Sequence, residues 1–535
     1  VVAVSLKKKD INFIYIILLA QLMLFIGRTG VEFIRSWILL HMSTRINISI
    51  LSDFLIKLMK LPMPFFDTKM VGDIMQRMGD HSRIQNFLTS QSLSTLFSFF
   101  NLLVFSFVLA YYHMMIFTVF LAASTLYVIW IVLFLKQRKE LDHRRFGISS
   151  NNQSTVIQLI QGMQEIKLNN CEKNKRWEWE RLQARLFRYQ IKNLALEQYQ
   201  QGGAFFINEG KNIGITFIAA IAVVNGQITL GAMLAIQYII GQLNSPVQQL
   251  IGFVQSTQDA LISMERLNEV HEKENEEPAD KLFTYRLPKN RDISIKRLSF
   301  SYPGAGNEPV LKAIDLHIPE GKTTALVGMS GSGKTTMLKL LLKFYPPAKG
   351  EIWIGDSNFK MLSPRAWRKH CGAVMQDGFI FSDTIADNIA VGEDLPDIEK
   401  LEHAVEVANI REFIESLPLG FNTKIGAEGN GISEGQKQRI LIARAVYKDP
   451  EYIFFDEATN ALDANNERSI MQNMQEFFRN RTVVVVAHRL STVKNADNIV
   501  VLDEGRIVEQ GTHAELTQKE GAYFDLVKNQ LELGI

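Results

Sequence analysis

The sequence has few cysteines and almost no net charge. Its 535 residues include only two cysteines, Cys171 and Cys371, which excludes a small secreted scaffold held together by disulfides. The formal net charge is +2, with 47% hydrophobic and 21% charged residues. These values exclude a disordered or collagen-like chain and give no indication of a nucleic-acid-binding protein. A secretory signal-peptide pattern is also lacking.

The small net charge conceals two different halves. Residues 1–271 contain 26 Lys and Arg and 17 Asp and Glu, a net charge of +9, whereas residues 272–535 carry −7. The first half also has two stretches without any charged residue, 52 residues over 84–135 and 47 residues over 212–258. A membrane-spanning helix needs about 20 apolar residues. Each stretch is therefore long enough for two spans, an arrangement that a soluble core does not accommodate.

Five membrane spans are predicted in the first half. The two uncharged stretches break at polar turns, Tyr111–His113 and Asn225–Gln227, and a further span runs from about Ile11 towards Leu40. Three charged residues in the second half of that span predict a face turned to a partner helix or to water: Arg28, Glu32 and Arg35. Basic residues between Lys136 and Arg145 mark the cytoplasmic side.

The segments between the spans are long and charged on the cytoplasmic side. Regions 45–83 and 136–195 are helical in pattern and too long for turns, which predicts helices that continue below the membrane. Five spans place the first residue, Val1, outside. We therefore expect a sixth span to precede Val1, giving a membrane domain over residues 1–271 with five of six spans present.

The second half has the pattern of a nucleotide-binding domain. Residues 272–290 begin with a charged run containing Pro278 and are predicted to form a solvated linker. Residues 291–535 alternate short apolar runs with helical stretches, which indicates an α/β domain. Three runs are predicted to be buried parallel strands: 323–327, 452–455 and 482–487.

A glycine-rich segment, GMSGSGKTT over Gly328–Thr336, follows the first of these strands and opens a helix. This is the context of a P-loop, in which backbone N–H groups and the helix dipole bind phosphate oxygens. Lys334 is predicted to reach the β- and γ-phosphates of ATP, and the Thr335 hydroxyl to ligate Mg²⁺. The predicted ATP contacts here are Gly328, Ser330, Gly331, Ser332, Gly333, Lys334, Thr335 and Thr336.

Two carboxylates, Asp456 and Glu457, end the second predicted strand. We assign Asp456 to the Mg²⁺ shell and Glu457 to the base that activates the attacking water. His488 follows the third strand, and the expected strand order would place it beside the same phosphates, where we expect it to contact the γ-phosphate.

Together these motifs resemble the ATP-binding cassette (ABC) transporters of the exporter type, along essentially the whole chain. The resemblance implies a helical transmembrane domain followed by an α/β P-loop domain that hydrolyses ATP. It also implies that Tyr302 stacks on adenine, that Gln376 ligates Mg²⁺ and senses the membrane domain, and that His488 is the switch histidine.

The signature sequence of the family is matched by ISEGQ, residues 432–436. The resemblance implies that Ser433, Gly435, Gln436 and the D-loop Asp463 contact the nucleotide held by another subunit, so this half-transporter would pair with itself or a similar chain. Glu434 departs from the family, which has glycine there, and Asn460 stands where Ser is usual. Segments 65–74 and 161–167 are similar to the family's intracellular loops, whose short helices dock on the cassettes.

Within the family the chain is most similar to bacterial exporters of peptides and bacteriocins, some of which carry an N-terminal cysteine peptidase. Neither Cys171 nor Cys371 fits that nucleophile, and we expect any such domain to precede Val1. The resulting hypothesis is ATP-driven export through the bacterial cytoplasmic membrane, among its lipids, with the ATPase in the cytosol and no nucleic-acid partner. Two alternatives remain: a lipid or drug exporter of the same fold, and a non-transport ATPase with paired cassettes.

Overall fold

A computed structural model describes residues 11–304, 308–426, 429, 431–456, 464–487 and 493–532. The chain divides into two compact units. The helical unit comprises Val1–Leu61 and Lys69–Lys273, and the α/β unit comprises Pro62–Thr68 and Glu274–Ile535. A short segment from the first half of the sequence thus belongs to the α/β unit.

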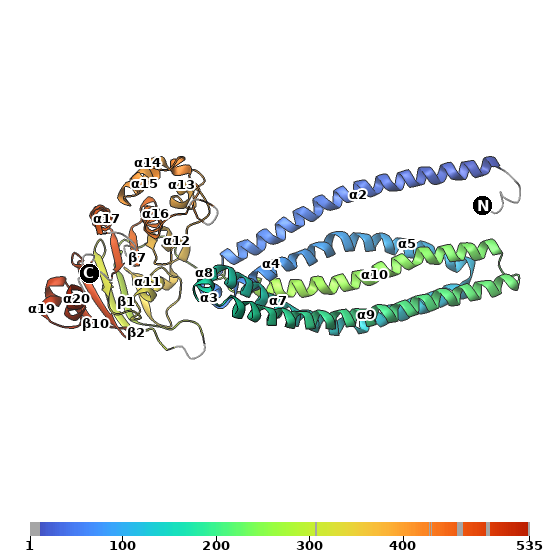
Figure 1. The fold of residues 1–535 in the computed structure, drawn as a ribbon, viewed down its shortest axis with the longest axis horizontal. Helices are drawn as coiled ribbons and strands as arrows, with labels where there is room; N and C mark the ends of the chain where they lie inside the picture. The colour runs from blue at the N-terminus through green and yellow to red at the C-terminus, as the bar shows by residue number, and fades with distance from the viewer. Residues whose placement is uncertain are drawn as a thin grey trace. The chain divides into compact units, whose positions relative to one another are not determined.

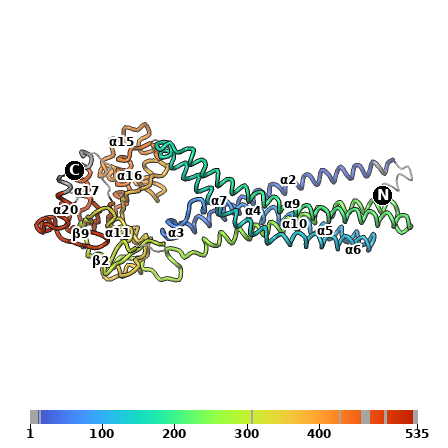
Figure 2. Tube along the Cα trace, turned by 60° about the horizontal axis from the view of Figure 1, so that its bottom comes forward, coloured from blue at the N-terminus to red at the C-terminus, as the bar shows by residue number. Residues whose placement is uncertain are grey.

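The helical unit consists of long helices that run alongside one another (Figure 1 and, rotated, Figure 2). Helix α9 alone has 53 residues, about 80 Å at 1.5 Å per residue, far more than a bilayer requires. The predicted continuation of helices beyond the membrane is therefore confirmed. The elements are α2 (Ile11–Met59), α4 (Val71–Asn86), the π-helical turn η1 (Phe87–Gln91), α5 (Ser92–Tyr112), α6 (Met114–Leu133), α7 (Leu135–Gln161), α8 (Met163–Leu168), α9 (Glu172–Val224) and α10 (Leu230–His271).

Four of the described helical runs are long and apolar enough to cross a membrane: Tyr15–Met59, Val71–Tyr112, Met114–Gln161 and Glu172–Val224. The predicted breaks are confirmed, because α5 ends at Tyr112 before α6, and α9 ends at Val224 before α10. The fifth predicted span forms α10, which is not among these four.

Charged residues are buried where the cytoplasmic parts of α4, α7 and α10 pack together. The Arg266 side chain donates to Asp80 at 3.0 Å and to Asp142 at 2.8 Å, and its guanidinium lies 4.1 Å from the centre of the Phe146 ring. Arg83 also pairs with Asp142, at 3.2 Å. This buried arginine network joins three helices that are far apart in the sequence.

The α/β unit contains two sheets. The smaller has the order β2-β1-β4-β5 and is antiparallel. The larger has the order β10-β9-β3-β8-β7-β6 and is parallel except at β10. The strands are β1 (Ile293–Phe300), β2 (Leu311–Ile318), β3 (Thr323–Val327), β4 (Lys349–Ile354), β5 (Ser357–Asn358), β6 (Cys371–Val374), β7 (Tyr452–Asp456), β8 (Thr482–Val486), β9 (Asn498–Asp503) and β10 (Arg506–Gly511).

The larger sheet is covered on both faces, which explains its uninterrupted apolar runs. In β8, Val484 and Val486 pack with the smaller sheet and α11, whereas Val483 and Val485 pack with α14, α16 and α17. The three predicted strands are confirmed.

The helices of the α/β unit are α3 (Met63–Thr68), α11 (Lys334–Leu341), α12 (Pro364–Lys369), α13 (Ile385–Ile389), α14 (Ile398–Val407), α15 (Arg411–Glu415), α16 (Glu434–Tyr447), α17 (Ala464–Phe477), α19 (His513–Gln518) and α20 (Ala522–Glu532), with 3-10 turns η2 (Phe359–Met361) and η3 (Gly420–Asn422).

The segment predicted to be a solvated linker docks on the α/β unit, so that expectation is wrong for residues 276–284. Glu276 pairs with Arg368 at 2.9 Å, and Glu277 accepts from the Ser363 hydroxyl and from a backbone N–H at the start of α12. The Thr284 N–H donates to the Met361 carbonyl at 2.8 Å. The charged run binds the N-terminus of α12, where carboxylates are favoured by the helix dipole.

Candidate functional site

The P-loop connects β3 to α11 through backbone conformations that only glycine adopts readily. Gly328 has φ of 148° and Gly333 has φ of 103°. A Cβ at Gly328 would lie 2.0 Å from the Leu502 carbonyl oxygen, and one at Gly333 would lie 2.7 Å from the Leu311 side chain. The chain therefore needs glycine at both positions to pass between β2 and β9.

Two side chains of the loop are arranged to receive an anion. The Lys334 side chain is buried, and its Nζ donates to the Gly328 and Met329 carbonyls at 2.9 Å each. The Ser332 hydroxyl is buried and has no hydrogen-bond partner among the described residues. A lysine held over the loop and an unsatisfied hydroxyl fit the phosphates of ATP at the start of α11.

The residues predicted to hold Mg²⁺ lie at one edge of the larger sheet. The Thr335 hydroxyl donates to Asp456 Oδ1 at 3.1 Å, and Asp456 is fully buried at the end of β7. Val374 pairs with Phe455, so Gln376, two residues past β6, follows at the same edge. Among the described residues no group of three His, Cys, Asp or Glu could hold a metal. A hydroxyl, a carboxylate and an amide instead fit Mg²⁺, which keeps several waters and bridges substrate phosphates.

The aromatic residue predicted to stack on adenine lies beside the P-loop helix. The Tyr302 hydroxyl is 3.2 Å from Thr336 Oγ1, and the Tyr302 ring packs at its edge against Phe300, with centroids 5.1 Å apart. The structure therefore brings Tyr302, Lys334, Thr335, Thr336 and Asp456 into one region.

The predicted signature sequence caps the helix α16. The Ser433 hydroxyl accepts from the Gln436 N–H at 3.2 Å, and the Gln436 side chain accepts from the Ser433 N–H at 2.8 Å. This capping box starts the helix at Glu434. Glu434, which replaces the family's glycine, pairs with Lys437 on the exposed surface. Gly435 lies in the first turn.

Three predicted site residues, Glu457, His488 and Asp463, lie outside the described residues. Strand β7 ends at Asp456, and β8 lies between β3 and β7 in the sheet. Their roles remain predictions.

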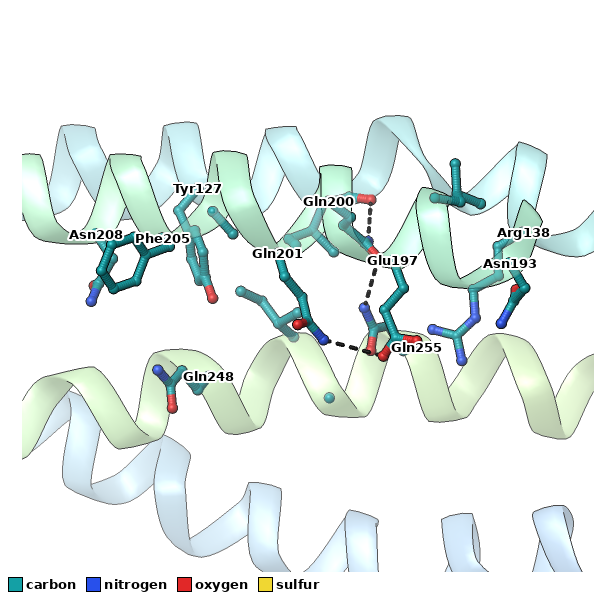
Figure 3. Close-up of a pocket in the computed structure, with 15 residues that line it drawn as sticks. Tyr127, Arg138, Asn193, Glu197, Gln200, Gln201, Phe205, Asn208, Gln248 and Gln255 are labelled. Atoms are coloured by element: carbon teal, nitrogen blue, oxygen red, sulfur yellow. Dashed lines mark hydrogen bonds between the residues drawn. The ribbon is translucent and has the colours of Figure 1, made fainter. Parts of the chain in front are cut away.

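A second candidate site is a cavity of about 490 Å³ within the helical unit, which the sequence reasoning missed. Its wall contains amides and charged groups from α7, α9 and α10, together with apolar residues. Figure 3 shows several of them between α9 and α10. Gln201 donates to Glu197 at 3.1 Å, and Gln255 to Gln200 at 3.5 Å. The polar lining residues are Tyr127, Arg138, Asn193, Glu197, Gln200, Gln201, Asn208, Gln248 and Gln255.

Replacing Lys334 by alanine is expected to weaken ATP binding by roughly 10- to 100-fold, the scale of a lost hydrogen bond to a charged group. Fluorescent-nucleotide titration of the full chain measures the change in Kd. Lys349→Ala, at an exposed position of β4, removes the same charge elsewhere and should leave the Kd unchanged. An unchanged Kd for Lys334→Ala would contradict the assignment.

Comparison with known proteins gives consistent matches over both units. Residues 1–247 match the family described as "ABC transporter transmembrane region", and residues 311–460 match "ABC transporter". The leukotoxin translocation ATP-binding protein LktB of Mannheimia haemolytica is 34% identical over 503 residues, which cover 94% of this chain and 70% of LktB. LktB of Bibersteinia trehalosi has the same identity and coverage.

A solved structure, that of a bacterial Atm1-family ABC exporter with ATP bound, superposes with a TM-score of 0.89. The superposed region covers 99% of this chain and 93% of the exporter chain, and the two sequences are 23% identical. At this identity the likeness concerns the fold alone.

Proposed function

The chain belongs to the ABC transporters, and on that premise we propose that it exports peptides, bacteriocins among them, as a pair of half-transporters. It is an ATP-binding, multi-pass protein of the cytoplasmic membrane with a cytosolic ATPase unit. The relatives named for leukotoxin translocation support a polypeptide substrate.

In the proposed cycle each residue of the ATP site has one role. Lys334 and the P-loop N–H groups bind the phosphates, while Thr335, Asp456 and Gln376 hold Mg²⁺, which neutralises the phosphate oxygens when bound. Glu457 takes a proton from the attacking water, and His488 contacts the γ-phosphate. The contacts from the other subunit would be Ser433, Gly435, Gln436 and Asp463. ATP binding would favour the closed pair, and hydrolysis would release it.

The cavity in the helical unit carries the proposal of a peptide substrate. Side-chain amides each offer both a donor and an acceptor, as a peptide bond does. The side-chain amide of Gln248 has no hydrogen bond with the described residues. The side-chain amide of Gln255 donates only a long hydrogen bond, 3.5 Å to the Gln200 side chain. A wall with such unused amide groups favours an extended peptide over a lipid tail or an apolar drug, which would leave these groups unpaired.

The test measures ATP hydrolysis by the full chain in lipid nanodiscs with added leader-type peptides, lipids or apolar drugs. We expect peptides to stimulate hydrolysis and Gln248→Leu to reduce that stimulation while leaving basal hydrolysis intact. Gln242→Leu is the matched control, because Gln242 lies on α10 but does not line the cavity. Stimulation by lipids or drugs and not by peptides would replace the peptide proposal with the alternative exporter.

A further inference from the structure

A lysine is buried among the membrane-spanning helices. Lys211 lies on α9 and is only 6% exposed. At 1.5 Å per residue it lies about 20 Å from Val224, where α9 ends on the outer side. The hydrocarbon core of a bilayer is about 30 Å thick, so this depth falls inside it. A charge is costly there, and ionisable residues at such positions are therefore candidates for a function.

The Lys211 ammonium group is surrounded by neutral partners. Its Nζ donates to Asn208 Oδ1 at 2.9 Å and to Asn244 Oδ1 at 2.8 Å. It also lies 4.9 Å from the centre of the Phe120 ring, a cation–π contact. Asn208 lies on α9, Asn244 on α10 and Phe120 on α6. Lys211 forms no ion pair within the described part of the chain, so its positive charge has no carboxylate beside it.

The contact with Lys211 fixes the orientation of the Asn208 amide. An ammonium group has donors and no acceptor, so the Asn208 oxygen must face Lys211 and the Asn208 nitrogen is directed away from it. Asn208 also lines the cavity of the helical unit, and Figure 3 shows it at the end that holds Tyr127 and Phe205. This end of the cavity therefore offers N–H donors. While Lys211 is in place, the amide does not turn to offer its oxygen.

The other end of the cavity has a different charge. Arg138 lines it (Figure 3) but is neutralised by Asp259, at 2.9 Å. The carboxylate of the cavity wall, Glu197, lies about 16 Å from Asn208 along α9 at 1.5 Å per residue. The positive charge of Lys211 is thus closest to the Asn208 end, and a charge in a medium of low dielectric constant acts strongly on its surroundings.

We propose that Lys211 is a positioning residue that makes the Asn208 end of the cavity select a carboxylate of the exported substrate. Lys211 holds the Asn208 oxygen, the Asn208 N–H groups bind the carboxylate, and the ammonium charge behind the amide stabilises the bound anion. The inference rests on the proposed function in taking the substrate to be a peptide. It narrows that function to peptides that carry an acidic group.

Calorimetric titration of the full chain in nanodiscs tests this selection with three matched peptides of equal length. The first has one central Glu, the second has Gln in its place, and both are amidated at the C-terminus. The third has the central Gln and a free C-terminal carboxylate. We expect at least one carboxylate peptide to bind about tenfold more tightly than the Gln peptide, the scale of a hydrogen bond to a charged group.

The two possible failures of this titration are distinct. Equal Kd values for the three peptides would overturn the carboxylate inference and leave the peptide proposal standing. Binding of none of the peptides would overturn the peptide proposal itself, and the inference with it. Tighter binding of the Gln peptide would also overturn the inference, because it would show that this end repels an anion.

Lys211→Met removes the charge and frees the Asn208 amide to turn. The carboxylate and Gln peptides should then bind with nearly equal Kd. The Kd values are compared within each variant, so a partial loss of folded protein, the effect of a merely structural lysine, does not alter their ratio. A tenfold preference retained by Lys211→Met would contradict the role given to the lysine.

A matched control and a second variant complete the test. Lys192→Met removes a lysine from the exposed surface of α9, where Lys192 lies over the Tyr189 ring and does not line the cavity; it should keep the full preference. Asn208→Asp leaves Lys211 with a partner but replaces the N–H donors by oxygen, and should abolish the preference. Equal loss in Lys192→Met, or an unchanged preference in Asn208→Asp, would refute the inference.

Discussion

Glu457→Gln is expected to lower the rate of ATP hydrolysis by about 10²- to 10⁴-fold, the range attributed to a general base. The amide has nearly the shape of the carboxylate but cannot accept the proton of the attacking water. Glu457 directly follows Asp456, which ends β7 beside the Thr335 hydroxyl. Because neither the P-loop nor Asp456 changes, the Kd for ATP should remain close to that of the wild type.

Single-turnover and steady-state assays measure the loss, and nucleotide titration measures the Kd. Glu451→Gln is the matched control: Glu451 immediately precedes β7 at the opposite end of the strand and pairs with Arg291. It should hydrolyse ATP at nearly the wild-type rate. Full turnover by Glu457→Gln would show that another group is the base.

Arg266→Met should destabilise the helical unit by about 3–5 kcal/mol, the cost of breaking a buried ion pair. Arg266 is 4% exposed and contacts Asp80 and Asp142 at 3.0 and 2.8 Å. Without the guanidinium, two carboxylates from different helices lose a buried partner. Methionine fills a similar volume. The loss of stability would therefore come from the missing charge and not from a new cavity.

Unfolding in a mild detergent, followed by circular dichroism with increasing denaturant, measures this effect. Arg176→Met is the control, because Arg176 also pairs with a carboxylate, Glu180, but both side chains are exposed, at 63% and 50%. An exposed pair contributes about 0–1 kcal/mol. Equal shifts in the two variants would contradict the role given to burial.

The conformation of the P-loop and the position of Thr335 beside Asp456 were largely predictable because their signals are local, whereas the roles of the site residues in ATP hydrolysis stay predictions. The P-loop requires glycines and a lysine within nine consecutive residues, and the strands β3, β7 and β8 are short apolar runs that need burial on both faces. The breaks between α5 and α6 and between α9 and α10 were also predictable, since polar turns interrupt uncharged stretches. Each of these features depends on neighbours in the sequence.

The features that sequence reasoning missed depend on distant contacts. The hydrogen bond from the Tyr345 hydroxyl to the Asp67 carboxylate joins residues 278 apart in the sequence. It requires the complete α/β unit, and no local pattern indicates it. The cavity left a weaker signal: Asn193, Glu197 and Gln201 recur every four residues along α9 and so share one face. Such a polar face is equally typical of a helix exposed to water. The cavity could therefore not be predicted without knowing that α10 packs against this side of α9.

The docked segment before β1 has a practical consequence for anyone producing the ATPase part alone. A truncation at residue 291, which the composition suggests, would remove the carboxylates of Glu276 and Glu277 and expose the N-terminus of α12. The compact α/β unit includes the chain from Glu274 onward. The ion pair of Glu276 with Arg368 and the hydrogen bond that Glu277 accepts from Ser363 lie within that unit. A fragment that begins at Glu274 still lacks α3. The Tyr345 hydroxyl, which donates to the Asp67 carboxylate in the full chain, would donate to water instead.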